Sequence, residues 1–215
     1  GIPTTDLVES IFNSYLSEVT LANTVTAIPQ KAFQGCSALT KVTIENTPAA
    51  PSSLASIGVS AFYGCTNLTS ITIPNEVKYI NHGTFQYCSS LTNITIPKKV
   101  IMIVSSAFNG CTNLKSVTFE KGSKLTTICS WAFMNCTSLT NINLPDGLTS
   151  IESNVFEGCT NLKKVEIPAS VTYIGHYSFM GCTALTIYCE AEEMPSSWEV
   201  QWNIDNCPVV WGYTK

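Results

Sequence analysis

The chain has 215 residues, of which 45% are hydrophobic and 12% charged, and its formal net charge is −4 at pH 7. That length fits one domain or two, and the apolar share supplies a core and argues against disorder. All eleven basic residues are lysines, whereas arginine is the usual two-pronged partner of phosphate and carboxylate groups. The composition therefore weighs against nucleic acid, an anionic membrane surface and anionic ligands as partners.

One phrase recurs through most of the chain: Ile-x-x-x-x-Phe-x-x-Cys-x-x-Leu-x-x-Ile-x-Ile-Pro. Seven copies place a phenylalanine at positions 33, 62, 85, 108, 133, 156 and 179. A cysteine follows each phenylalanine after three residues, and a leucine follows each cysteine after three more. The steps of 23 to 29 residues lie in the range of leucine-rich repeats. Such a unit buries its apolar side only by stacking on its neighbours, which predicts a solenoid.

One copy indicates how a single coil is built. The apolar spacing in residues 57–65 is roughly helical and predicts a one-turn helical or 3₁₀ segment. The alternation in Ile71-Thr72-Ile73 predicts a short strand with one buried face, and Pro74 ends it. Stacked strands would form a parallel sheet with about 4.8 Å between neighbours. The expected fold class is therefore an α/β solenoid, a right-handed leucine-rich-repeat superhelix of seven to eight coils over residues 16–189.

Two segments break the regular spacing, and both follow a predicted strand. Six extra residues lie in 45–56, and two lie in 120–127. Surface loops tolerate added residues, so drift in a loop is the favoured interpretation. A dedicated binding loop at 45–56 is the alternative.

A solenoid needs a cap at its first coil, because that coil otherwise exposes its apolar ladder. Residues 1–15 are expected to form this cap, with a helix over 5–15. Asp6 is a suitable residue to begin it, since its side chain can accept hydrogen bonds from the first free amides. The apolar pattern of a strand then starts at Leu16.

The last coil needs a cap as well, and residues 190–215 are expected to supply it. A short helix is predicted near 196–203. Three of the four tryptophans lie in this segment, at positions 198, 202 and 211. Plugging the open core is the favoured role for these rings, and an aromatic binding platform is the alternative.

Ten cysteines would suggest a disulfide framework in a short secreted chain, but seven of them share one repeat position. That placement is typical of small buried thiols in a core. Cys189 and Cys207 lie outside the repeat pattern in the same region, so a disulfide between them is one alternative and two free thiols the other. The sequence has no Cys-x-x-Cys motif. Its two histidines occupy equivalent positions four repeats apart, so they would be about 19 Å from each other. We therefore expect no metal site and no cofactor.

The sequence shows no catalytic motif either. Aspartate occurs only at positions 6, 146 and 205, and nothing places a carboxylate pair together. The sequence contains neither a glycine-rich phosphate loop nor a serine elbow. The protein is therefore expected to have no catalytic residues and to be no enzyme.

Alternation along the predicted strands sends one set of side chains away from the core. These outward positions are the candidate binding residues: Lys41, Thr43, Ser70, Thr72, Asn93, Thr95, Ser116, Thr118, Asn141, Asn143, Lys164, Glu166 and Tyr188. Stacked threonines stabilise a sheet whatever its face does, so a merely solubilising stripe is favoured over a recognition surface. The more varied half from Asn141 to Tyr188 is the better candidate for recognition.

The consensus Ala-Phe-x-x-Cys-x-x-Leu-x-x-Ile-x-Ile-Pro, present in full at residues 61–74, resembles the BspA-like class of leucine-rich repeats. The match covers about residues 16–189, and segments 187–192 and 207–211 resemble the closing part of such proteins from gut Firmicutes. The resemblance implies a bacterial cell-surface or secreted protein that adheres to a protein or glycan on a host or neighbouring cell. It brings no shared catalytic residues with it.

The function expected from these observations is a non-enzymatic binding or adhesion module that uses the sheet face. The alternative is a stalk or spacer that presents another domain. The chain opens at Gly1 without a secretion leader, which is typical of a trimmed form, so its extracellular location is implied by the resemblance alone. The longest apolar run, Val100–Val104, is far too short for a membrane span, and a monomer is expected.

Overall fold

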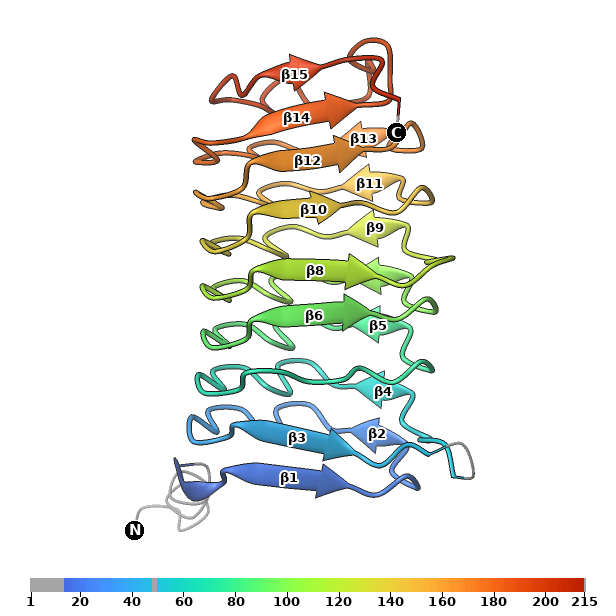
Figure 1. The fold of residues 1–215 in the computed structure, drawn as a ribbon, viewed down its shortest axis with the longest axis vertical. Helices are drawn as coiled ribbons and strands as arrows, with labels where there is room; N and C mark the ends of the chain where they lie inside the picture. Colours follow the sequence, from blue (N-terminus) through green and yellow to red (C-terminus); the bar gives the residue numbers. More distant parts are fainter. Residues whose placement is uncertain (1–13, 48–49, 215) are drawn as a thin grey trace, which may run out of the picture.

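The coils contribute short strands to one side of the molecule, except for the coil of residues 70–73, because alternating Ile, Val and Leu side chains bury one face of each strand. A computed structural model describes residues 14–47 and 50–214 as a right-handed parallel solenoid of about eight coils (Figure 1). The broad side consists of β1 (Glu18–Leu21), β3 (Lys41–Ile44), β6 (Asn93–Ile96), β8 (Ser116–Phe119), β10 (Asn141–Asn143), β12 (Lys164–Ile167), β14 (Thr186–Cys189) and β15 (Val209–Val210).

A second, narrow side was not predicted. It consists of two-residue strands, namely β2 (Ala27–Ile28), β4 (Ser56–Ile57), β5 (Tyr79–Ile80), β7 (Met102–Ile103), β9 (Thr127–Ile128), β11 (Ser150–Ile151) and β13 (Tyr173–Ile174). Five of these, β5 to β13, form one continuous parallel sheet. Each coil can therefore contribute strands to two parallel sheets, whereas the repeat pattern predicted only one sheet.

The third side of each coil is a pair of turns, so the predicted helical or 3₁₀ segment is wrong. In the second coil, the amides of Ala61 and Tyr63 donate to carbonyls three residues back. The amides between and beside them, those of Ser60, Phe62 and Gly64, donate to carbonyls of the next coil. A 3₁₀ helix needs consecutive i→i+3 bonds, and alternate amides here are committed to the neighbouring coil instead. The turns therefore act as a third ladder.

Alternate amides can point along the solenoid because two residues in every coil have positive φ. The pairs are Lys31 and Gly35, Ser60 and Gly64, Gly83 and Tyr87, Ser106 and Gly110, Trp131 and Asn135, Asn154 and Gly158, and Tyr177 and Gly181. Glycine and asparagine adopt this conformation at low cost, which accounts for their frequency at the second position.

Substitutions at two glycines distinguish the destabilisation caused by a backbone clash from that caused by a strained φ angle. A Cβ added to Gly58, whose φ is not positive, would lie 2.4 Å from the amide nitrogen of Gln30 in the preceding coil. Gly35 has a φ of +73° and open space around it. We expect Gly58→Ala to lower the free energy of unfolding by about 3 kcal/mol, because backbone must move. Gly35→Ala should lower the free energy of unfolding by only about 1 kcal/mol, because the positive φ is its only cost. Urea unfolding measures both, and equal costs would contradict the contact argument.

A stack of phenylalanine rings runs through the core. The seven repeat rings are spaced 5.2–5.7 Å between centroids, with interplanar angles of 14° or less. Six of the rings are fully buried, and Phe33 at the first coil is partly buried. At the other end the edge of Trp202 closes the stack, 5.9 Å from Phe179. Each ring thus packs on the coil before it and the coil after it.

The repeat cysteines form a second internal ladder. Six of them point Sγ at the carbonyl oxygen of a phenylalanine in the preceding coil, at 3.1–3.3 Å. Each of these carbonyls also accepts the amide of the cysteine in its own coil. Cysteine suits this position because it is small and apolar yet carries an S–H donor. Burial raises the thiol pKa along the ladder, to about 12 for Cys182.

The disulfide considered between Cys189 and Cys207 is absent. All ten cysteines are buried, and none of them is part of a disulfide. Cys207 instead places its Sγ 3.6 Å from the carbonyl of Cys182, where it continues the thiol ladder by one coil. Burial raises the pKa of Cys189 to about 12.

The C-terminal segment closes the solenoid as predicted, but without its predicted helix. Trp198 and Trp202 are 3% and 4% exposed and pack against each other at 5.0 Å. Residues 196–203 form turns, because the amide of Glu199 donates to Ile174 in the preceding coil and not within a helix. Trp198 and Trp202 are therefore buried in the core at this end, whereas Trp211 is half-buried against it. Strand β15 then adds to the sheet beside β14.

At the other end, the predicted helix over 5–15 lies outside the described residues except for Ser14 and Tyr15, which are helical. The first strand of the solenoid, β1, starts at Glu18 and pairs in register with β3.

The broad sheet is interrupted in two places. Between β3 and β6, a single bridge joins Lys41 to Ser70, and Thr72 and Ile73 pair with neither strand. The strand predicted at 71–73 is therefore wrong in its pairing, although Thr72 is exposed between two buried isoleucines as expected. The second interruption separates β8 from β10. Each interruption follows one of the two insertions in the chain, although the Lys41–Ser70 bridge still joins equivalent repeat positions.

Candidate binding face

The thirteen candidate binding residues all lie on the outer surface of the broad sheet. Every one is exposed or half-buried, whereas the residues between them are buried. The pairing places them in two columns, so that Asn93 lies beside Ser116 and Thr95 beside Thr118. Alternation therefore identified the face correctly, and Thr186 completes the first column beside Lys164.

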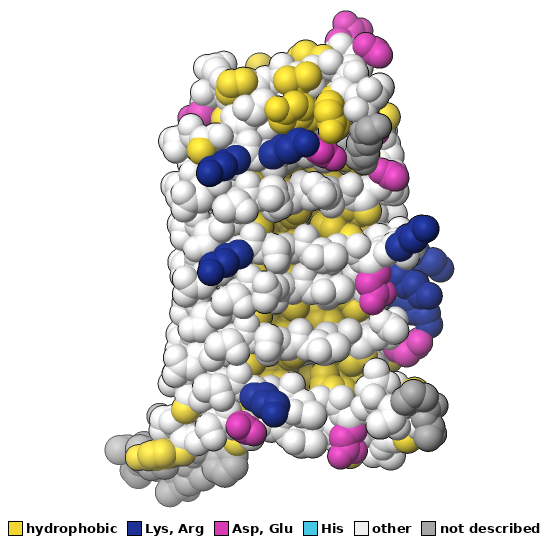
Figure 2. Space-filling model, viewed as in Figure 1, with side chains coloured by type: hydrophobic (Ala, Val, Ile, Leu, Met, Phe, Trp, Pro, Cys, Tyr) yellow, Lys and Arg dark blue, Asp and Glu magenta, His cyan; other side chains and the backbone are white. Residues whose placement is uncertain are grey.

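The interruptions divide this face unevenly. Strands β10, β12, β14 and β15 form one continuous sheet, which brings Asn141, Asn143, Lys164, Glu166 and Tyr188 together. The candidates from Lys41 to Thr118 lie on separate pieces of sheet. Figure 2 shows the face as mostly uncharged polar surface, with hydrophobic side chains gathered at its C-terminal end.

The C-terminal end holds the most ordered group of side chains on the face, which we call the tyrosine–lysine cluster: Lys164, Glu166, Tyr188 and Tyr213. The Lys164 ammonium lies 2.6 Å from Glu166 Oε1, and 4.9 Å and 5.3 Å from the centroids of Tyr188 and Tyr213. The two rings meet edge to face at 5.1 Å. The Tyr213 hydroxyl donates to Glu166 Oε1 at 3.2 Å, so Lys164 and Tyr213 each contact all three other members.

The charges within this cluster offset each other. The hydrogen bond and negative charge of Glu166 hold the pKa of Lys164 above its usual range. Lys164 is 41% exposed and Glu166 13%, so solvent screens part of their attraction. The cluster thus presents neutral aromatic surface with polar edges, a composition enriched at the centres of interfaces.

Sequence reasoning missed Tyr213. The repeat pattern does not predict where this side chain lies, because Tyr213 is in the closing segment beyond β15. The Tyr213 amide donates to the carbonyl of Cys189, and Gly212, with a φ of +64°, turns the chain back toward the face. The glycine between Trp211 and Tyr213 is the only local signal of this turn.

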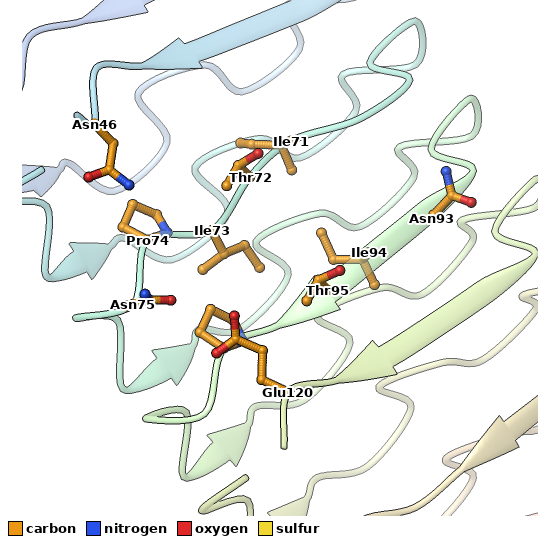
Figure 3. A pocket seen from close by; sticks show the side chains of 11 residues that line it. Asn46, Ile71, Thr72, Ile73, Pro74, Asn75, Asn93, Ile94, Thr95 and Glu120 are labelled. Atoms are coloured by element: carbon orange, nitrogen blue, oxygen red, sulfur yellow. The ribbon is translucent and has the colours of Figure 1, made fainter. Parts of the chain in front are cut away.

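A groove lies where the sheet is first interrupted. Its volume is about 410 Å³, and it is lined by Asn46, Ile71, Thr72, Ile73, Pro74, Asn75, Asn93, Ile94, Thr95, Pro97 and Glu120 (Figure 3). The insertion at 45–56 supplies Asn46, whose Oδ1 accepts a hydrogen bond from the Ser52 amide at 3.1 Å. The floor is apolar and the rim carries amides and hydroxyls, so the groove suits an uncharged polar ligand.

A second hollow, of about 330 Å³, lies at the other interruption. Residues 119–123 and 143–147 line it, and Glu120 lines both hollows. The two insertions that the sequence marked as irregular therefore border the two depressions of the face.

Other kinds of site are not found in the described parts of the chain. Within residues 14–47 and 50–214, no three His, Cys, Asp or Glu side chains converge to hold a metal ion. The same residues contain no helix with the length and hydropathy to cross a bilayer.

The sequence matches a family model described as the BspA type leucine rich repeat region, in six copies over residues 8–124 and 120–193. The chain therefore belongs to the BspA-type leucine-rich-repeat family. No curated protein matches the sequence significantly.

Solved structures of bacterial leucine-rich repeat proteins share the fold. The Treponema pallidum protein is 32% identical over 79% of this chain and 78% of its own, with a TM-score of 0.69. The Bacteroides ovatus protein is 25% identical, covering 91% of this chain and 63% of its own, with a TM-score of 0.60. One from Eubacterium ventriosum is 23% identical, with coverage of 93% and 60% and a TM-score of 0.63. The chain thus spans about three fifths of the Bacteroides and Eubacterium proteins.

Proposed function

We propose that this chain is a non-enzymatic binding module that recognises a protein or glycan partner through the broad sheet face. The observation that carries this proposal is the tyrosine–lysine cluster, in which two tyrosine rings and a charge pair are held together at one end of a polar face. Ordered aromatic side chains lose little freedom on binding and are enriched among residues that dominate binding energy.

The rest of the face supports the cluster as an anchor. Asn141 and Asn143 lie in the neighbouring strand and are exposed, so their amides can bond a partner seated on the tyrosines. Extracellular display, on a cell surface or after secretion, is proposed from the family, and the partner is then a molecule on a host or neighbouring cell.

A spacer role is the second candidate, and the continuous phenylalanine stack favours it. Seven rings and three hydrogen-bonded sides give a stiff rod that could present another part of a longer protein. The two functions differ in whether the isolated 215 residues bind any partner.

The test is a binding screen of the purified chain against matrix proteins, mucins, glycans and bacterial envelope fractions. We expect a hit whose affinity falls at least about thirtyfold in the double variant Tyr188→Ala/Tyr213→Ala, as at interface residues worth about 2 kcal/mol.

The matched control is Tyr63→Ala/Tyr87→Ala. These two tyrosines also meet edge to face, at 5.4 Å, but they lie on the turn side of the solenoid. Equal losses in both variants would count against the cluster as anchor, and a screen without any hit would favour the spacer.

A further inference from the structure

We infer that the edge of the broad face beyond β6 and β8 is a docking surface for an anionic polysaccharide. The loops there carry five of the eleven lysines, and we call this group the lysine corner: Lys78, Lys98, Lys99, Lys121 and Lys124. Figure 2 shows basic side chains gathered at one edge of the face. The site differs from the tyrosine–lysine cluster, and the inference does not depend on the function proposed for that cluster.

Hydrogen bonds and an ion pair tie the corner together across three coils. The Lys124 amide donates to the Lys98 carbonyl at 2.9 Å, and the Lys98 amide donates to Glu120 Oε2 at 3.0 Å. In the coil before, the Lys99 ammonium lies 2.6 Å from Glu76. The charges of Lys99 and Lys78 together hold the pKa of Glu76 below its usual range. The lysines are therefore neighbours in space as well as in sequence.

The charge of the corner is opposite to that of the remaining molecule. Its five lysines outnumber Glu76 and Glu120, which leaves +3, whereas the rest of the chain has six lysines against thirteen acidic residues and a charge of −7. Asp146, across the second hollow from Lys121, reduces the local excess to +2. An anionic partner is consequently attracted to this edge and repelled elsewhere, because exposed like charges act within about 10 Å at 0.1 M salt. The sequence prediction against anionic ligands rested on the lack of arginine, and that against nucleic acid and anionic membranes rested on the total charge, which conceals this separation.

The chemistry around the corner favours a saccharide over other anions. Lysine acts as a point charge and suits sulfate or carboxylate groups spaced along a chain, whereas paired phosphate recognition prefers arginine, which the chain lacks. Both hollows of the face adjoin the corner, since Glu120 lines each of them. The first offers Asn75, Thr95 and other uncharged donors and acceptors over an isoleucine floor (Figure 3). Sugar hydroxyl groups both donate and accept, so they match this lining.

The test measures binding of the full chain to heparin, to a polyuronate, to neutral dextran, to poly-glutamate and to duplex DNA. We expect binding to one or both anionic polysaccharides that is lost in about 1 M salt, where charges are screened within about 3 Å. The heparin and polyuronate arms distinguish sulfate from carboxylate as the recognised group. Equal or tighter binding of poly-glutamate or DNA would overturn the saccharide assignment, and so would binding that salt does not weaken.

Two variants of equal net charge locate the site. The triple variant Lys98→Gln/Lys121→Gln/Lys124→Gln should bind the polysaccharide roughly tenfold to a hundredfold more weakly. The control Lys31→Gln/Lys115→Gln/Lys163→Gln removes three exposed lysines elsewhere and should change affinity less than about threefold. All six residues are exposed and glutamine is a polar side chain only about one atom shorter than lysine, so both variants should fold. Equal losses in the two variants, or no binding by the unaltered chain, would overturn the inference.

Discussion

Raising the pH from 8 to 9.5 is expected to lower the free energy of unfolding by about 7 kcal/mol through the six inner ladder thiols alone, because these thiols ionise in the unfolded chain but stay protonated in the folded protein. The six inner thiols belong to Cys65, Cys88, Cys111, Cys136, Cys159 and Cys182. Burial raises the pKa of each above its usual range, to about 12 for Cys182. In the unfolded chain the same thiols ionise near pH 8.5.

The sign of the effect follows from the protons bound in each state. Above pH 8.5 the folded protein binds more protons than the unfolded chain, so stability falls as pH rises toward the folded pKa values. Each thiol contributes about 1.2 kcal/mol of the loss between pH 8 and 9.5. Since domains of this kind are stable by about 5–15 kcal/mol in total, unfolding should occur within or just beyond this window.

Urea unfolding at the two pH values, with a reductant present, measures the loss directly. The variant Cys111→Ala serves as the control, because it removes one titrating thiol while the other five remain. Its free energy of unfolding should fall by about 1.2 kcal/mol less over the same interval. A stability that does not change between pH 8 and 9.5 would show that the thiols ionise as readily in the folded protein as in the unfolded one.

Strict repetition made the core predictable from the sequence. Seven recurrences of Phe, Cys and Leu in one order report the period directly, and stacked copies have only one way to bury the same side chains. The structure accordingly stacks Phe62 on Phe85 and aligns Cys65 with Cys88. The outward positions followed for the same reason, since the alternation around Asn141 and Asn143 fixes which side chains face solvent.

The turn side was not predictable from spacing alone. The apolar positions of residues 57–65 fit one helical turn as well as two successive turns, and hydrophobic periodicity does not distinguish them over so short a segment. The deciding feature is the positive φ at positions such as Trp131 and Tyr177, where the residue type gives no warning. The prediction of a C-terminal helix was wrong for a similar reason, because the Glu199 amide donates to the Ile174 carbonyl in the preceding coil.

The sequence identified candidate site residues only where they occupy positions of the repeat. Lys164, Glu166 and Tyr188 occupy outward strand positions and were identified, whereas Tyr213 reaches them from beyond the last coil. The lysine corner depends on loops of successive coils lying side by side. Its charge disappears in a total for the whole chain, so the structure was needed to reveal it.

Replacing Phe108 by alanine is expected to lower the free energy of unfolding by about 4 kcal/mol. Its ring is fully buried in the middle of the stack, 5.4 Å from Phe85 and 5.2 Å from Phe133. Deleting such a ring removes buried apolar surface and leaves a cavity that a regular ladder cannot close by local collapse. Neighbouring coils stabilise each other in a solenoid, so the lesion should also weaken the coupling between its two halves.

Phe33→Ala is the matched control for this change. Phe33 is partly buried and, among the described residues, stacks on one ring, that of Phe62 at 5.2 Å, so its loss should cost only about 2 kcal/mol. Urea unfolding followed by circular dichroism and by tryptophan fluorescence measures both variants, and all four tryptophans lie after Phe108 in the chain. If coupling is weakened, the two signals should coincide for Phe33→Ala and separate for Phe108→Ala, because fluorescence then reports the C-terminal half alone. Equal costs at the two positions would show that stacking on both sides adds nothing to the stability of a ring.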